Sequence, residues 1–405
     1  MSDVRRELER LIGPIPQDAA TIRTEEDRWQ VPSYAKPDLA LVEGRGSTVT
    51  DPAGRRYLDL YGGHAVAALG YGHPRLVAAI REQSETLLFQ SNAVALEVRA
   101  SAAEKLVSIA PKTLDRVFFV NSGAEANENA LRMAISVTQR RKVLAITHGF
   151  HGRTAAAGAV TWKSDKWYGF PQQPFDVDFI PRNDCAAAET MIGPDIAAVI
   201  VEPVQGVAGA FDLSAEFLQA LRSATRQHGA LLIADEVQSG MGRCGDYFAV
   251  QGYGIEPDLM TSAKSLGGGV PCGAVLCRAD IAGHFSPGDL GTTFGGGPLA
   301  AAAIGAVIDT IRDENLLANV REQEARIRER CITGPVTRIQ GKGLLLGLVC
   351  SRPALDVRNA LLEQDILTGT SADPDVVRIL APLVINDEHV DHLAHALAAI
   401  TGAGA

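Results

Sequence analysis

Two charged residues end short apolar runs in the second half of the chain, and their types could do chemistry together. Lys264 follows the run Leu259–Ala263 and precedes three glycines, and Asp235 follows Leu231–Ala234. A lysine amine beside glycines, where the backbone can pass close to a ligand, can carry an aldehyde cofactor as a Schiff base. An aspartate at the end of an apolar run can hold a heterocyclic N–H. The two residues lie 29 positions apart (264 − 235), about one strand–helix–strand unit.

These two roles are typical of pyridoxal phosphate (PLP) chemistry, because a carboxylate beside the pyridine nitrogen keeps it protonated and makes the ring an electron sink. For Asp235 the alternative is an acid that binds Mg²⁺ beside a nucleotide. That site needs a Gly-x-x-x-x-Gly-Lys-Ser/Thr loop, which the sequence lacks. A lone lysine is usually a solvated surface residue, and the apolar run before Lys264 favours the cofactor. Val237 could pack on the ring face, and Gln238 could hydrogen-bond the ring hydroxyl.

The segment Asn121–Asn127 follows an apolar run and opens a stretch of helical composition. Exposed N–H groups at a helix start, next to small residues, form a phosphate site. The alternative is an ordinary N-cap by Ser122 with Glu125 in the first turn, and both can hold at once. The polar, glycine-rich loop Gly291–Pro298 could add hydroxyl groups to the phosphate site, or it could be a flexible loop.

A second polar segment, Phe150-His151-Gly152-Arg153, follows another apolar run. Phe150 could stack on a flat ring, and Arg153 could bind a carboxylate through two hydrogen bonds. Taken by itself the segment is more simply a loop with a surface arginine, so its interpretation depends on the neighbouring motifs.

Short apolar runs recur from about residue 115, and stretches of helical composition such as 125–139 and 214–228 lie between them. The runs are Arg116–Val120, Lys142–Thr147, Ala197–Val201, Ala230–Ala234, Leu259–Ala263 and Gly273–Cys277. Strands alternating with helices predict an α/β fold with a mostly parallel sheet covered on both faces. Ligands of such sheets gather at the carboxyl ends of the strands, which is where the polar segments lie.

The chain has 405 residues, which predicts one large domain and a smaller one. We expect residues 1–60 to form an N-terminal arm and part of the small domain, with a hairpin turning at Asp51-Pro52-Ala53-Gly54. Residues 61–300 would form the large cofactor-binding domain. Residues 301–405 would form a smaller α+β domain, joined to it by an alanine-rich helix near 297–312 and followed by a charged helix over 314–330.

The bulk composition limits the partners. A net charge of −10 and a pI of about 5.4 argue against nucleic acid and anionic membranes as main partners. The six cysteines show neither CxxC spacing nor a zinc pattern with histidine, so we expect free buried thiols and no metal site. The charged N-terminus lacks an apolar signal core, and no apolar run reaches membrane-spanning length, which predicts a cytoplasmic protein.

Taken together, the motifs resemble those of the class III (ω-amino) aminotransferases, from about residue 34 to 395. In family order they are Ser-Gly-Ala-Glu-Ala-Asn-Glu, Phe-His-Gly-Arg-Thr, Val-Glu-Pro-Val-Gln-Gly, Asp-Glu-Val-Gln-Ser-Gly, Ala-Lys-Ser-Leu-Gly-Gly-Gly and Thr-Thr-Phe-Gly-Gly. The resemblance implies PLP fold type I, with a mostly parallel seven-stranded sheet in the large domain and a smaller α+β domain. Within the class the chain is most similar to the N-acylornithine (acetylornithine/succinylornithine) aminotransferases.

The motifs and the resemblance together predict the site residues. Lys264 and Asp235 would be catalytic. Cofactor contacts are expected from Ser122, Gly123, Ala124, Phe150, Glu202, Asp235, Val237, Gln238, Lys264 and Thr293. Thr293 would reach the phosphate of the neighbouring subunit's cofactor, so the resemblance implies a homodimer with shared active sites. Substrate contacts are expected from Arg153, Thr292, Arg378 and His64. Arg153 would hold a substrate carboxylate, and Arg378 the α-carboxylate of glutamate.

The chain departs from the family pattern at three positions. Val207 stands where many relatives have a glutamate that masks the second arginine when an ω-amine binds, so the usual gate between substrates is in doubt. His64 stands where relatives carry an aliphatic or aromatic residue near the substrate, and a core histidine is the alternative. With Val207 and His64 together, the chain is similar to the N-succinylornithine branch of the acylornithine enzymes. Gly297 replaces a usual asparagine.

The reaction that the resemblance implies moves the δ-amine of an N-acylornithine to 2-oxoglutarate. Its products are N-acylglutamate semialdehyde and glutamate, in arginine biosynthesis. The alternatives are an aminotransferase for another ω-amine (ornithine, 4-aminobutyrate or an acyl-lysine), a PLP-dependent racemase or epimerase, and a PLP-binding protein without activity. A racemase would use Lys264 and Asp235 but would need no keto acid.

Overall fold

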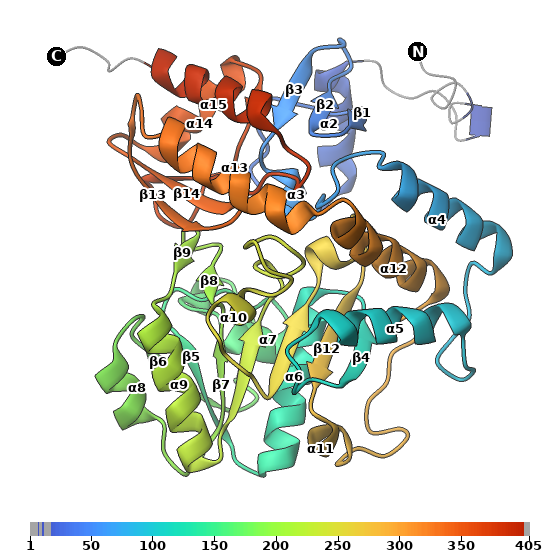
Figure 1. The fold of residues 1–405 in the computed structure, drawn as a ribbon, viewed down its shortest axis with the longest axis vertical. Coiled ribbons are helices and arrows are strands. Elements are labelled where there is room, and N and C mark those ends of the chain that lie inside the picture. Colours follow the sequence, from blue (N-terminus) through green and yellow to red (C-terminus); the bar gives the residue numbers. More distant parts are fainter. Residues whose placement is uncertain (1–6, 8–9, 12–17, 401–405) are drawn as a thin grey trace.

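A seven-stranded sheet forms the centre of the lower part of the molecule in Figure 1. The computed structural model describes residues 7, 10–11 and 18–400. In spatial order the strands are β4 (Arg116–Val120), β12 (Gly273–Cys277), β11 (Leu259–Ser262), β10 (Leu231–Asp235), β7 (Ile196–Val201), β5 (Lys142–Ile146) and β6 (Asp176–Ile180). Strand β12 is antiparallel to both neighbours, and the other pairs are parallel. The predicted α/β fold with a mostly parallel seven-stranded sheet is confirmed.

Strand β6 is the one strand of this sheet that the apolar runs did not predict. Strand β6 pairs with β5 alone and lies at the edge of the sheet. Its sequence, Asp-Val-Asp-Phe-Ile, alternates polar and apolar residues, and its exposure alternates in the same way. An edge strand with one solvated face carries this two-residue period, whereas the central strands are buried on both faces and are mostly apolar.

The carboxyl ends of four neighbouring parallel strands carry the polar segments that the sequence singled out. Strand β10 ends at Asp235, and β11 ends two residues before Lys264. Strand β7 is followed by Glu202, and β5 by the segment 148–153. Because parallel neighbours end at the same edge of a sheet, these side chains meet there.

The helices around the sheet begin where their sequences predict. Helix α6 (Gly123–Thr138) is capped by Ser122, and α9 (Ala215–His228) is capped by Ser214 and ends before Gly229 in the left-handed conformation. The alanine-rich helix α12 (Pro298–Asp313) starts with a proline in its first turn and packs against α4 (Pro74–Thr86) and α5 (Glu97–Ile109). The predicted helices at 125–139, 214–228 and 297–312 are confirmed.

The upper part of Figure 1 contains elements from both the early and the late part of the described chain. The predicted hairpin is confirmed: β2 (Thr48–Thr50) pairs antiparallel with β3 (Arg56–Asp59). Strand β15 (Ile366–Leu367), from the other end of the chain, then pairs parallel with β3. The division of the chain at residues 60 and 300 stays a prediction.

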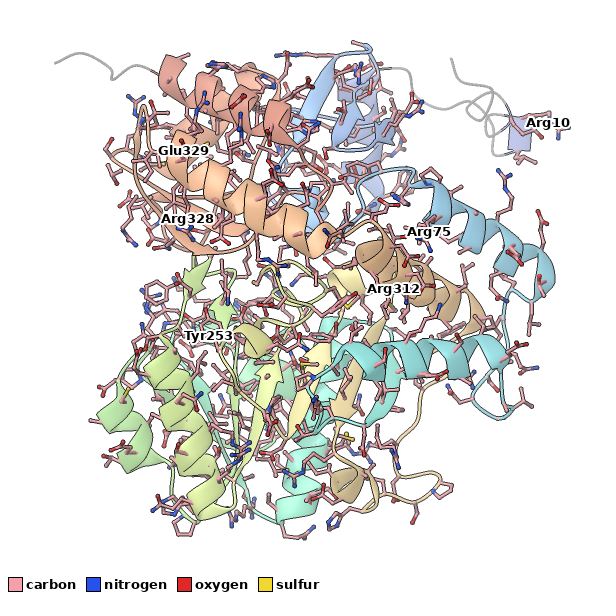
Figure 2. All side chains as sticks on the ribbon, viewed as in Figure 1. Arg10, Arg75, Tyr253, Arg312, Arg328 and Glu329 are labelled. Carbon is pink, nitrogen blue, oxygen red and sulfur yellow. The ribbon has the colours of Figure 1, made fainter. Side chains whose placement is uncertain are left out.

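The C-terminal part also contains a three-stranded antiparallel sheet of β13 (Val336–Lys342), β14 (Leu345–Cys350) and β16 (Val376–Ile379). Helix α13 (Leu316–Arg330) is held to β13 by Arg328 (Figure 2), whose guanidinium donates to the carbonyls of Ile339 at 3.0 Å and Gly341 at 2.6 Å. Helix α15 (Asp387–Ala399) packs beside α13. The charged helix predicted over 314–330 is confirmed.

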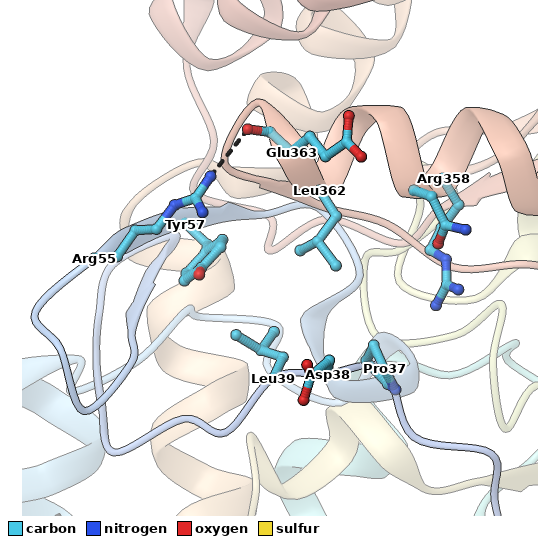
Figure 3. A pocket seen from close by; sticks show the side chains of 9 residues that line it. Pro37, Asp38, Leu39, Arg55, Tyr57, Arg358, Leu362 and Glu363 are labelled. Atoms are coloured by element: carbon cyan, nitrogen blue, oxygen red, sulfur yellow. Dashed lines mark hydrogen bonds between the residues drawn. The ribbon is translucent and has the colours of Figure 1, made fainter. Parts of the chain in front are cut away.

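A groove of about 460 Å³ lies between β3, helix α14 (Ala354–Glu363) and residues 37–39 (Figure 3). Arg55 donates across it to the backbone carbonyl of Glu363 at 2.9 Å. None of the predicted site residues lines this groove. Residues from the N-terminal segment form one side of the groove, and residues of helix α14 form the other.

Helix α2 (Ala19–Trp29) is the described portion of the predicted N-terminal arm, and residues 1–6, 8–9 and 12–17 lie outside the described residues. Among the helices of the described ranges, none has both the length and the apolar character needed to cross a bilayer. All six cysteines are free. Five are buried as expected, and Cys185 is partly exposed.

Candidate active site

A cavity of about 490 Å³ opens at the carboxyl ends of β5, β7, β10 and β11. It is lined by ten residues that the sequence predicts: Ser122, Gly123, Ala124, Phe150, Arg153, Glu202, Asp235, Val237, Gln238 and Lys264. Tyr34 from the N-terminal segment and Val66 also line it. Side chains from segments more than a hundred residues apart therefore share one cavity.

Lys264 starts the short 3-10 helix η2 (Lys264–Gly267) directly after β11, with a positive φ of 45°. It is half-buried in the cavity wall, so the expectation for an ordinary solvated lysine does not describe it. Burial lowers the pKa of its ammonium group, while the charges of Asp235 and Glu202 oppose that shift. A lowered pKa increases the fraction of neutral amine, which is the form that attacks a carbonyl carbon.

Asp235 is fixed in the cavity by three donors. Its Oδ2 atom lies 2.7 Å from Nδ2 of Asn127 and 2.7 Å from Nδ1 of His151, and its Oδ1 atom accepts from the N–H of Val237 at 3.0 Å. Thr261 donates to Oδ1 of Asn127 at 2.7 Å, which fixes the orientation of that amide. These hydrogen bonds fix the orientation of the carboxylate.

Sequence reasoning gave no role to Asn127 or His151, although both lie in the motifs. The sequence offered two signals. One was the amide of Asn127 on the buried face of helix α6, and the other was the imidazole of His151 beside Phe150. Neither residue type specifies a partner 108 or 84 positions away.

Glu202 holds the loop that carries Phe150. Its carboxylate accepts from the N–H groups of Phe150 at 2.8 Å and Gly206 at 3.2 Å. Burial raises the pKa of Glu202 to about 7. Its position in the wall is compatible with the predicted cofactor contact, and the hydrogen bonds show that it also shapes the cavity.

The start of helix α6 supports both interpretations of its sequence. Ser122 Oγ accepts from the N–H of Glu125 at 3.1 Å, and the Glu125 carboxylate accepts from the N–H of Asn121 at 2.8 Å, so the N-cap is present. The first N–H groups of a helix have no partner within it. A Cβ atom added to Gly123 would lie 2.6 Å from Cγ1 of Val237, so a larger residue would push Val237 into the cavity.

Four predicted residues lie outside the cavity lining. Thr292 borders it, because its Oγ1 accepts from Nδ2 of Asn121 at 3.3 Å and Asn121 lines the wall. Thr293 is exposed on the surface. His64 is exposed beside Tyr34, at 5.7 Å between ring centres, and is therefore not a core histidine. Arg378 is the fourth.

Arg378 is a buried cation, 6% exposed, on strand β16. Its guanidinium donates to the carbonyls of Thr370 at 2.7 Å and Gly206 at 3.3 Å, and to the hydroxyl of Tyr61 at 3.0 Å. These acceptors are neutral. Burial lowers the pKa of Arg378, but a guanidinium stays charged at neutral pH. The side chain of Val207 next to Gly206 cannot accept a hydrogen bond, so it cannot mask this charge.

Arg153 is the second cation and differs in its exposure. It lines the cavity from an exposed position, with its guanidinium carbon 5.3 Å from the ring centre of Trp167. A stacked guanidinium keeps its planar donor edge free for a carboxylate. The site therefore offers one buried and one exposed guanidinium.

The residues present fit pyridoxal phosphate. The cavity holds an amine with a lowered pKa at Lys264, a fixed carboxylate at Asp235 and a helix N-terminus at Ser122. The buried Oε1 atom of Gln238 has no hydrogen-bond partner within the described chain, and it lines the same cavity. A ring hydroxyl is the kind of donor that this atom lacks.

These features on this fold define a PLP-dependent enzyme. The chain belongs to the class III aminotransferases, whose family model, "Aminotransferase class-III", matches residues 31–401. An acetylornithine aminotransferase of Methanopyrus kandleri is 41% identical over 383 residues, covering 93% of this chain and 97% of that protein. A succinylornithine transaminase/acetylornithine aminotransferase of Pseudomonas aeruginosa is 39% identical over 91% of this chain and 94% of that protein.

Solved structures agree with this assignment. The ornithine aminotransferase of Toxoplasma gondii has a TM-score of 0.90 at 28% identity, covering 99% of this chain and 98% of that one, and its structure contains PLP at the active site. The acetylornithine aminotransferase of Elizabethkingia anophelis has a TM-score of 0.85 at 29% identity, covering 95% and 99%. The predicted family, fold and cofactor are confirmed.

Proposed function

We propose that this aminotransferase moves the δ-amine of an N-acylornithine, acetyl or succinyl, to 2-oxoglutarate, forming N-acylglutamate semialdehyde and glutamate in arginine biosynthesis. The relatives named above are acetylornithine and succinylornithine enzymes, and they match nearly the whole chain. The structural observation that carries the proposal is a pair of guanidinium groups: Arg153 is exposed in the cavity lining, and Arg378 is buried and bonded to Gly206, whose N–H donates to Glu202 in the cavity wall. Glutamate has two carboxylates and an acylornithine has one or two, so both substrates can use them.

Each protein group then has a task. PLP, when bound, supplies an electron sink for the substrate carbon that bears the amine. Asp235, fixed by Asn127 and His151, holds the proton on the ring nitrogen. Lys264 Nζ removes the proton from the substrate carbon, and its lowered pKa suits it to act as a base. Arg153 holds the acylornithine carboxylate and later the distal carboxylate of glutamate, and Arg378 holds the α-carboxylate.

The proposed enzyme is a homodimer that shares its active sites. Leu88, Phe89 and Phe294 are exposed and line an apolar cavity of about 490 Å³ beside Asn121. The Phe89 and Phe294 rings lie 5.1 Å apart. An exposed apolar patch of this kind favours a protein partner. Thr293 lies next to Phe294. A second copy that covers the patch would therefore bring the cofactor of that second copy near Thr293 of the first. Light scattering of the purified protein measures its mass and distinguishes a dimer from a monomer.

The free cysteines support a cytoplasmic location.

A half-reaction test with purified enzyme decides the substrate. N-acetylornithine, N-succinylornithine or ornithine is added without a keto acid, and the absorbance of the bound cofactor is followed. Rapid conversion by one N-acylornithine and slow conversion by ornithine is the expected result, and it names the acyl group. If none of the three reacts while PLP is bound, the donor is another ω-amine. Racemisation of an amino acid without conversion of the cofactor would support a racemase instead.

A further inference from the structure

Residues 62–65 form a turn with a left-handed backbone conformation. Gly62, Gly63, His64 and Ala65 all have positive φ angles, of 55°, 56°, 66° and 66°. Glycine adopts this conformation freely, but His64 and Ala65 carry a Cβ atom that makes it unfavourable. Strain of this kind persists only where the surrounding structure imposes it, and it gathers at functional sites. The turn determines where the His64 side chain lies.

The turn places His64 between two tyrosine rings. Its Nδ1 atom lies 2.9 Å from the hydroxyl of Tyr61, with the ring centres 4.8 Å apart. The ring of Tyr34, which lines the active-site cavity, has its centre 5.7 Å from that of His64. The ring is exposed, so a ligand can reach it.

The hydrogen bonds fix where the proton of His64 lies. A guanidinium can only donate, so Arg378 donates to the Tyr61 oxygen at 3.0 Å. Within the described chain, the only other polar atom bonded to that hydroxyl is Nδ1 of His64. The Tyr61 proton therefore goes to Nδ1, which must accept it. Burial raises the pKa of Tyr61, so the hydroxyl keeps its proton. His64 then carries its own proton on Nε2.

The surrounding charges keep this imidazole neutral. Neighbouring groups remove water from part of the ring, which lowers the pKa of His64, and the positive charges of Arg378 and Lys264 lower it further. Among the described residues, the hydrogen-bond acceptors of Arg378 are neutral oxygens, and the negative charge of Glu202 acts on it without a hydrogen bond. Arg378 and the Nε2–H of His64, joined through the Tyr61 hydroxyl, are two hydrogen-bond donors of this region. Two such donors favour an oxygen acceptor and disfavour an ammonium group.

We propose that His64, positioned by Tyr61 and the left-handed turn, is a specificity-determining residue that donates its Nε2–H to a carbonyl or carboxylate oxygen of the substrate. This inference rests on the proposed function. The oxygen can belong to the acyl group of the amine donor or to a carboxylate of glutamate, and free ornithine lacks the first and carries an ammonium group in its place. His64 thereby favours acylated donors, or glutamate, over ornithine.

The first test measures the proton position directly and needs no turnover. Nitrogen-15 NMR of the histidines in wild-type enzyme and in His64→Gln, which identifies the His64 signals by their loss, reports the tautomer. The expected result is a neutral ring protonated on Nε2 at pH 7. Tyr61→Phe should then give a mixture of tautomers, because Nδ1 loses its donor. A wild-type ring protonated on Nδ1 or on both nitrogens overturns the proposal, as does a Tyr61→Phe spectrum identical to wild type.

The second test assigns the acceptor. Half-reaction rates are measured for wild type, His64→Leu and His64→Gln with an N-acylornithine, ornithine and glutamate. His64→Leu should lose about tenfold in kcat/KM for the substrate whose oxygen is bound, which corresponds to one hydrogen bond. His64→Gln keeps a donor and should recover most of that loss, while ornithine should be unaffected by either change.

The substrate that responds shows which oxygen is bound. Equal rates for all three substrates in His64→Leu overturn the proposal. If no N-acylornithine reacts with wild-type enzyme, the proposed function fails, but the glutamate half-reaction and the NMR tautomer still test His64 separately.

Discussion

The Nδ1 atom of His151 lies 2.7 Å from Oδ2 of Asp235, and both side chains are buried. The other ring nitrogen of His151 is buried without a hydrogen-bond partner among the described residues. A carboxylate oxygen only accepts, so Nδ1 is the donor of this hydrogen bond. The histidine thus orients the carboxylate.

Replacing His151 with leucine should weaken catalysis while leaving the cofactor bound. Asp235 loses a donor but keeps Asn127 and Val237. A hydrogen bond to a charged group is worth about 1.5–3 kcal/mol, so kcat should fall roughly 10- to 100-fold. Steady-state kinetics and the cofactor absorbance of the purified variant measure both effects. His148→Asn is the control, because His148 follows the same strand but contacts Trp162, with ring centres 5.7 Å apart. An unchanged kcat in His151→Leu would contradict the orienting role.

Replacing Lys264 with alanine should abolish turnover, with a loss of about a thousandfold or more. The amine at this position is the proposed base, and no other lysine lines the cavity in the described part of the chain. Single-turnover absorbance measurements check the rate. Added methylamine should restore part of it, since a small amine can enter the space that the side chain leaves. Near-parent turnover without added amine would remove Lys264 from its assigned role.

Replacing Val207 with glutamate should make glutamate and 2-oxoglutarate bind more weakly. The carbonyl of the preceding residue, Gly206, already accepts from Arg378 at 3.3 Å. A carboxylate at position 207 would therefore lie near a guanidinium whose hydrogen-bond acceptors in the described chain are all neutral. We expect KM for 2-oxoglutarate to rise about tenfold, as for the loss of one hydrogen bond. Val207→Gln, with equal length and no charge, should show a smaller effect. Equal KM values in all three proteins would show that the position is not a gate.

Glu236 should make the enzyme less stable as the pH rises. Burial, reinforced by the charge of Asp235, raises its pKa to about 7, well above the ordinary value of a glutamate. An acid whose pKa is raised in the folded state contributes its full stability below the unfolded pKa and loses that contribution as the pH rises through the folded pKa. The loss falls between about pH 4.5 and 7 and amounts to at most about 3 kcal/mol.

Glu236→Gln supplies the comparison for that prediction. The glutamine can still accept from the N–H of Val250, where the carboxylate accepts at 2.8 Å, and can donate to Ser239. Denaturant unfolding of both proteins at pH 5 and pH 7.5 gives two differences in unfolding free energy. The wild type should lose more stability than Glu236→Gln over this interval. The same loss in both proteins would mean that Glu236 does not titrate there.

Much of the cavity followed from the order of strands and polar segments. Asp235, Glu202 and Lys264 each come directly after an apolar run, and parallel strands of one sheet end at one edge. The same reasoning missed β6, because an edge strand alternates polar and apolar residues. It also left His64 undecided, since a histidine in sequence gives no indication of its backbone conformation or exposure.

The sequence by itself determined the family, the α/β sheet and the residues that line the cavity, because local patterns of apolar residues, glycines and helix caps specify strands, turns and helix starts. Only the tertiary structure decided which side chains touch. The Arg378 guanidinium meets the Tyr61 hydroxyl across 317 positions, and Asn127 meets Asp235 across 108. Such contacts depend on how whole elements pack together and on the direction in which each side chain then points. No local pattern encodes that direction, and the proton on His64 depends on it.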